Sequence, residues 1–210
     1  MMSRTLFVRS AIAGAVAMTL IAGGVVAQSA NTQNPAEVQA GTYKLDPDHG
    51  KITWSIKHLG FSTYYGQFTN VSADLTIDPA NPSAGTLTAT VPLSGLAPNN
   101  DALKTHLLSA DFFDAAQFPE ATFKATSIVI DRADASEADV TGDLTLHGVT
   151  RPVVLEVKFN QGGPARGGGY KVGFDGETTI KRSDFGINTY LPALGDDVEL
   201  HIEGEFLKQS

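Results

Sequence analysis

The chain has 210 residues, of which 42% are hydrophobic and 18% charged, with a formal net charge of −8 and no cysteine. This composition fits one folded domain with a core of its own and excludes a disordered or fibrous chain. The lack of cysteine excludes disulfides and a lipoprotein anchor, and the negative charge argues against nucleic acid as a partner.

Residues 1–27 have the pattern of a cleaved secretory signal peptide. Arg4 and Arg9 form a positive n-region, the apolar stretch 11–22 is too short to span a bilayer, and residues 25–27 (VVA) fit a cleavage site. Cleavage there leaves 13 basic and 23 acidic residues, a formal charge of −10. We therefore expect an exported protein, periplasmic in a Gram-negative source, with no transmembrane segment in the mature chain.

The next segment, residues 28–41, is polar and has no hydrophobic period, so we expect a flexible leader before a single domain over residues 42–208.

The clearest strand pattern follows at residues 51–58. Ile52, Trp54, Ile56 and His58 alternate with polar residues, as a half-buried strand requires. If the inner face of this strand lines a lumen, His58 lies near the mouth of that lumen.

Seven more stretches have a strand-like composition and are separated by turns rich in glycine and proline. They are residues 66–78, 86–93, 121–130, 139–146, 153–160, 170–180 and 197–207. Short strands at regular spacing predict an all-β sandwich or barrel. A closed barrel of eight strands holds either packed side chains or one small ligand.

One segment has helical spacing instead. Asn99, Asn100 and Asp101 are a helix-start signal, and a short helix that follows them is expected to lie over the opening of the barrel. Three phenylalanines come after the helix: Phe112, Phe113 and Phe118. We interpret them as a core plug under a loop in preference to a ligand site.

Small residues on the predicted inner faces bear on the choice between a ligand and a filled core. Ala73, Ala89, Gly142 and Gly176 leave room for an apolar cavity unless bulky neighbours fill it. Glycine in a strand also serves bends and close backbone approach, so both alternatives stay open.

Catalytic and metal-binding motifs are not found. The five histidines lack metal-ligand spacing, and the chain has no nucleophile elbow, Walker loop or dinucleotide fingerprint. We therefore predict no catalytic residues, no metal and no enzymatic activity. In residues 180–187, Ser183 and Asp184 favour a turn, while Arg182 offers a fixed cation to a polar head group.

Several stretches, taken in order over residues 42–207, resemble the YceI-like family of secreted lipocalin-like barrels that bind polyisoprenoids and other long-chain amphiphiles. They are residues 43–47 (YKLDP) with His49, 56–62 (IKHLGFS), 66–68 (GQF), 106–114 (HLLSADFFD), 118–119, 122–123, 140–153 (VTGDLTLHGVTRPV) and 182–187 (RSDFGI).

The resemblance implies an extended antiparallel eight-stranded barrel with one short helix near its mouth. It also implies that the barrel binds, transports or stores a polyisoprenoid or quinone-like lipid in the periplasm and has no other cofactor. A homodimer and a role in the stress response are further implications of the resemblance. One position departs from the family pattern, because Leu108 stands where a basic residue is usual. Lys104 is then the remaining cation of the helix, which favours a neutral head group.

The candidate ligand-binding residues form two sets. Those for the lumen wall are Trp54, Ile56, Phe61, Phe68, Phe112, Phe123, Leu144 and Phe174, and those for the head group are His58, Lys104 and Arg182. Two other functions remain open. One is an enzyme acting on a lipid head group, if His58 and Asp184 converge, and the other is a filled barrel with a stress or interaction role.

Overall fold

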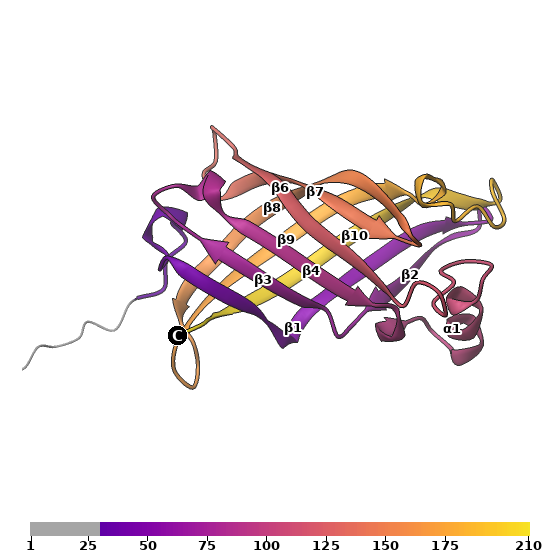
Figure 1. Ribbon diagram of the computed structural model, residues 1–210, viewed down its shortest axis with the longest axis horizontal. Helices are drawn as coiled ribbons and strands as arrows, with labels where there is room; N and C mark the ends of the chain where they lie inside the picture. Colours follow the sequence, from indigo (N-terminus) through magenta and orange to yellow (C-terminus); the bar gives the residue numbers. More distant parts are fainter. Residues whose placement is uncertain (1–29) are drawn as a thin grey trace, which may run out of the picture.

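The computed structural model describes residues 30–210, so the predicted signal peptide lies outside the described residues. Eight antiparallel strands form a closed barrel in the order β10-β9-β8-β7-β6-β4-β3-β1, and β1 pairs back with β10 (Figure 1). The predicted fold class is confirmed. The strands are β1 (Gly41–His58), β2 (Ser62–Phe68), β3 (Ser72–Ile77), β4 (Thr86–Pro92), β5 (Leu96–Ala97), β6 (Glu120–Ile130), β7 (Glu137–Leu146), β8 (Val149–Pro164), β9 (Tyr170–Lys181) and β10 (Leu194–Lys208).

Strand β1 has two neighbours on one side because it bends at a register shift between Leu45 and Gly50. Its first part pairs with β3, and its second part pairs with β2, which in turn pairs with the two-residue strand β5. The sequence pattern predicted one strand over 66–78, but the chain turns at Asn70, whose φ is 61°. Two strands therefore replace the predicted one, and β2 and β5 extend the barrel's sheet.

The α1 end of the barrel is closed by packed side chains. Helix α1 (Asp101–Leu108) starts where predicted, since the Asn100 side chain accepts a hydrogen bond of 2.9 Å from the Leu103 amide. Behind the helix, Phe112 is buried and Phe113 meets Phe68 edge to face at 5.8 Å. Phe112 and Phe113 thus belong to the predicted core plug, whereas Phe118 lies outside the core clusters and packs edge to face on His147 at 5.1 Å.

Three short elements stand at the opposite end of the barrel (Figure 1). They are the 3-10 helix η1 (Pro35–Glu37), the β3–β4 turn with η2 (Pro82–Ala84), and the β6–β7 turn. The segment predicted as a leader packs here in part, because Thr32 bridges to Gly162 and Val38 is buried in a core cluster. The remaining 3-10 helices are η3 (Leu93–Gly95) and η4 (Arg182–Phe185). No helix among residues 30–210 has the length and apolar character needed to cross a membrane.

Candidate functional site

The barrel lumen contains an almost entirely apolar cavity of about 280 Å³. Alternation along the strands directs every second side chain inward, so each strand contributes apolar residues to its wall. Wall residues of five strands are Leu75 (β3), Leu87 and Ala89 (β4), Phe123 and Ile128 (β6), Val140 and Leu144 (β7), and Leu155 and Val157 (β8).

Small inward residues keep part of this space open. Ala73, Ala89 and Gly176 all line the cavity. Gly142 does not, because the Phe123 ring covers it so closely that an added Cβ would overlap the ring. Three of the four small positions therefore leave room, and the fourth admits a bulky neighbour.

The cavity reaches the surface at the end formed by η1 and the two turns. Four of its lining residues there are exposed: Asp78 and Pro82 in the β3–β4 turn, and Ala135 and Glu137 at the β6–β7 turn. At its other end, Leu200 and Leu144 pack on clusters that contain the fully buried Leu96 and Phe185. No residue of α1 is among those lining the cavity. The helix thus lies at the closed end, whereas the sequence placed it near the mouth.

Three of the predicted wall residues line the cavity: Phe123, Leu144 and Phe174. Their binding of a ligand stays a prediction. Four others point into packed clusters nearer to α1, beyond the cavity floor: Trp54, Ile56, Phe68 and Phe112. The Trp54 ring stands over Gly66, where it leaves no space for a ligand.

Phe61 does not belong to the wall, because it is 90% exposed. It follows Leu59 and Gly60, which both have positive φ and turn the chain from β1 into β2. The tight turn breaks the alternation, so Phe61 points to solvent.

The predicted head-group residues lie away from the exposed rim of the cavity. His58 is exposed at the α1 end of β1, and Lys104 on α1 donates a hydrogen bond of 2.9 Å from Nζ to the Ser94 carbonyl. The ion pairs of the described histidines join His49 to Asp46 and Glu205, His106 to Asp111 and His201 to Glu177, and none joins His58 to Asp184.

Arg182 is 5% exposed and uses its guanidinium to hold the β9–β10 loop. Four of its five N–H groups donate to the carbonyls of Gly195 (2.7 Å), Ile187 (2.9 Å), Thr189 (2.9 Å) and Leu194 (3.0 Å). Burial lowers the pKa of Arg182, against the opposing effect of the Asp196 carboxylate. These contacts contradict the predicted head-group role and show a structural one.

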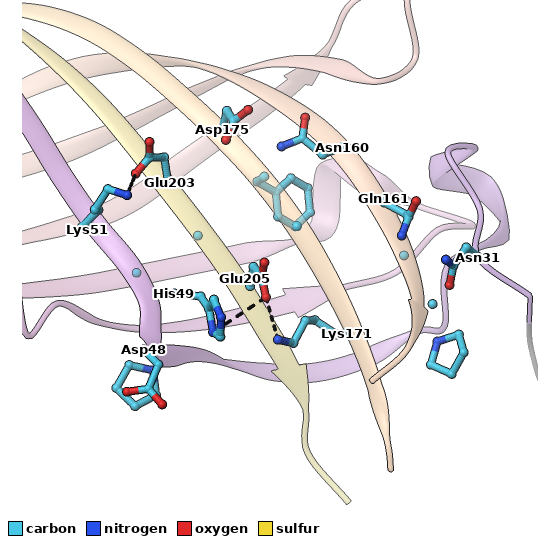
Figure 2. Close-up of a pocket in the computed structure, with 18 of the residues that line it drawn as sticks. Asn31, Asp48, His49, Lys51, Asn160, Gln161, Lys171, Asp175, Glu203 and Glu205 are labelled. Atoms are coloured by element: carbon cyan, nitrogen blue, oxygen red, sulfur yellow. Dashed lines mark hydrogen bonds and ion pairs between the residues drawn. The ribbon is translucent and has the colours of Figure 1, made fainter. Parts of the chain in front are cut away.

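A groove of about 550 Å³, lined by both polar and apolar groups, runs along the outside of β1, β10, β9 and β8 (Figure 2). It shares Lys51, Phe174, Asp175, Glu203 and Gly204 with the lumen cavity. The sheet is continuous at this place, since Lys51 pairs with Glu203 and Glu203 with Asp175 across the strands. The shared residues therefore form a common wall between groove and lumen.

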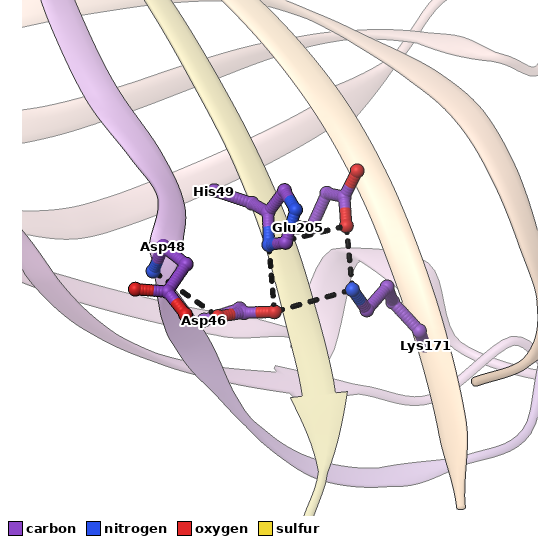
Figure 3. Close-up of polar contacts among 5 residues, drawn as sticks. All are labelled: Asp46, Asp48, His49, Lys171 and Glu205. Atoms are coloured by element: carbon purple, nitrogen blue, oxygen red, sulfur yellow. Dashed lines mark hydrogen bonds and ion pairs between the residues drawn. The ribbon is translucent and has the colours of Figure 1, made fainter. Parts of the chain in front are cut away.

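A charged cluster in this groove was not predicted from the sequence (Figure 3). Lys171 Nζ lies 2.6 Å from Glu205 Oε2 and 3.2 Å from Asp46 Oδ2, and His49 Nδ1 lies 2.9 Å from the same Asp46 oxygen. Burial alone would raise the pKa of Asp46, but hydrogen bonds from His49, the Asp48 amide and Lys171 lower it below its ordinary value. Asp46, His49 and Glu205 are close enough to hold a metal ion, but the Lys171 ammonium already fills the cation position between the two carboxylates.

Comparison with known proteins identifies the family. The model of the YceI-like domain matches residues 43–206. The chain belongs to the YceI-like family. This YceI-like chain is 40% identical over 172 residues to protein YceI of Escherichia coli O6:H1, an alignment that covers 81% of the chain and 88% of that protein.

Two solved structures share this barrel fold. The crystal structure of Burkholderia cenocepacia BcnA has a TM-score of 0.67 at 26% identity, covering 77% of this chain and 98% of that one. A polyisoprenoid binding domain from Saccharophagus degradans has a TM-score of 0.57, covering 81% of this chain and 100% of that one. At 15% identity, the second likeness concerns the fold alone.

Proposed function

We propose that this YceI-like protein binds a long-chain lipid, such as a polyisoprenoid, with the apolar tail inside the barrel. The observation that carries the proposal is the cavity of about 280 Å³, which is walled by apolar side chains and exposed at one end. Its size approaches the range of roughly 300–1,000 Å³ that is usual for small-molecule pockets. An apolar cavity of this kind excludes water and favours an apolar occupant.

Burial of the tail is sufficient to supply the affinity. Each methylene group removed from water contributes about 0.8 kcal/mol, so ten buried groups contribute roughly 8 kcal/mol before ordering costs are subtracted. A lipid tail therefore needs no polar contact inside the lumen.

A binding role is favoured over an enzymatic one. Arg182 is committed to backbone carbonyls, and His58 forms no ion pair with Asp184 that would prepare it for acid or base chemistry. The lumen cavity in turn disfavours the completely filled barrel.

Transport or storage in the periplasm is the process that we infer for this binding. This inference rests on the signal-peptide pattern of residues 1–27 and on the insolubility of an isoprenoid tail, which needs a carrier to cross water. A homodimer and a role in the stress response stay predictions from the family resemblance.

The test is native mass spectrometry of the mature protein purified from its own periplasm, followed by extraction of any released molecule. We expect an added mass that leaves as an isoprenoid or another long-chain amphiphile. A chain of the calculated mass that also refuses added polyprenols would contradict the proposal.

A pair of leucine substitutions locates the binding in the lumen. Ala89→Leu places three more carbons in the cavity and should weaken polyprenol binding about tenfold, as overpacking does. Ala102→Leu makes the same change on the exposed face of α1 and should leave binding unchanged. Equal affinities for the two variants would place the ligand outside the lumen.

A further inference from the structure

The rim of the lumen cavity carries mainly negative charge. Asp78 and Glu137 line the cavity and are exposed, and Asp131 and Asp134 stand in the β6–β7 turn that leads into Glu137. Glu37 belongs to η1, between the lining residues Pro35 and Val38. The cations near these five carboxylates include Arg132 in the β6–β7 turn, Lys158, and Lys208, whose Nζ donates a hydrogen bond of 3.0 Å to the Gln39 side chain just after η1.

Neutral donors hold most of these carboxylates in place. The Asp78 carboxylate accepts from the Ala80 amide at 3.0 Å, and the Asp131 carboxylate accepts from the amides of Ala133 and Asp134 at 2.6 and 2.9 Å.

Glu37 and Asp134 are also held by hydrogen bonds from neutral donors. The Glu37 carboxylate accepts hydrogen bonds from the Thr32 hydroxyl at 2.7 Å and from the side-chain amide of Asn34 at 3.1 Å. Hydrogen bonds from the hydroxyl and amide of Ser136 lower the pKa of Asp134. Glu137 forms an ion pair with Lys158 at 3.4 Å, and the charge of Lys158 also contributes to the lowered pKa of Asp134. The rim carboxylates are therefore fixed in position and outnumber these three cations.

The closed end of the barrel decides which part of a ligand meets this rim. Leu96 is 0% exposed and packs with Trp54 beneath the cavity, so a tail that fills the lumen leaves its head group at the open end. His58, Lys104 and Arg182 stand at the α1 end, where they do not reach that head group. A phosphate bound at a protein surface ordinarily requires Arg, Lys or a helix N-terminus, and this rim offers an excess of carboxylates instead.

We propose that the rim excludes anionic head groups, so that the natural ligand is a long-chain amphiphile with a neutral or cationic head. This inference rests on the proposed function and adds the class of head group to it. A single rim carboxylate repels an anionic head group only weakly at a separation of about one Debye length. The repulsions from several carboxylates add, so at low salt an anionic head group should bind on the order of tenfold more weakly than a neutral one.

Three ligands with one C20 tail test the inference: geranylgeraniol, geranylgeranylamine and geranylgeranyl phosphate. Their dissociation constants can be measured by competition in native mass spectrometry at low and at high ammonium acetate. We expect the alcohol and the amine to bind about tenfold more tightly than the phosphate at low salt, and the difference to shrink at high salt.

Two charge variants assign the effect to the rim. The triple variant Asp78→Asn, Asp134→Asn and Glu137→Gln should bring the phosphate close to the alcohol. A control changes three exposed carboxylates elsewhere, Glu120→Gln, Asp143→Asn and Glu156→Gln, and should keep the discrimination.

The outcomes separate the two proposals. If the phosphate binds as tightly as the alcohol, the head-group inference is overturned while lipid binding stands. If the rim triple still discriminates like the wild type, the assignment to these residues is overturned. If none of the three ligands binds, the proposed function fails and the inference falls with it.

Discussion

Replacement of Arg182 by methionine should strongly destabilise the protein. The buried guanidinium satisfies four carbonyl oxygens, two in the β9–β10 loop and two at the start of β10, and hydrogen bonds from a charged donor contribute about 1.5–3 kcal/mol each. These contributions are not additive, and methionine retains part of the packing. We therefore expect the free energy of unfolding to fall by about 3–5 kcal/mol, as for other broken buried charge networks.

Urea unfolding of the two proteins, followed by circular dichroism, measures this difference. Lys181→Met is the matched control, because it removes the same charge one residue earlier from an exposed ion pair with Asp197 and should leave the free energy of unfolding almost unchanged. A loss below about 1 kcal/mol for Arg182→Met, together with a loss of lipid binding, would refute the structural role and restore the head-group role.

Four further substitutions test the α1 end, the β1–β2 turn and the outer groove. Trp54→Ala should lower the free energy of unfolding by about 3–5 kcal/mol in urea titrations, and Trp54→Phe should cost less, because it keeps a ring and removes an indole N–H that has no partner among the described residues. Phe61→Ser should change the free energy of unfolding by less than about 0.5 kcal/mol and leave lipid binding unchanged, since Phe61 is 90% exposed. A large effect on lipid binding would instead show that Phe61 contacts the ligand. The lowered pKa of Asp46 stabilises the fold at pH values above its ordinary 3.8, and this stability is lost as the pH falls through the folded-state value. Lys171→Met removes one donor to Asp46, so the difference in unfolding free energy between pH 7 and pH 3 should become smaller than in the wild type.

Local patterns were sufficient to predict an all-β sandwich or barrel and the start of its helix, and the family resemblance singled out the barrel. Strand alternation depends on the two-residue period of the backbone, and the Asn100 cap depends on residues three positions apart. The separation of β2 from β3 was missed, because it depends on the left-handed backbone at Asn70, and the residues on both sides continue to look like one strand.

The position of a residue along the barrel axis could not be predicted in this way. Alternation shows that Trp54 and Phe123 both point inward, but only strand register shows that Trp54 belongs to the packed end and Phe123 to the cavity. The role of Arg182 was hidden for a similar reason. Its partners are backbone carbonyls of residues 187–195, and a sequence does not show where those carbonyls point.

The two ends of this barrel are built by different kinds of interaction, so stability and ligand selection should be separable. The α1 end depends on buried aromatic packing and on the Arg182 hydrogen bonds, where most changes of side chain disturb the fold. The open end consists of turns whose carboxylates point to solvent and bond to their own backbone, as Asp78 and Asp131 do. Charge at these positions can change at little expense of stability, because an exposed turn side chain contributes little to the core. If the rim selects the head group as we propose, related barrels could adapt to different lipids through these turns while the packed end stays the same.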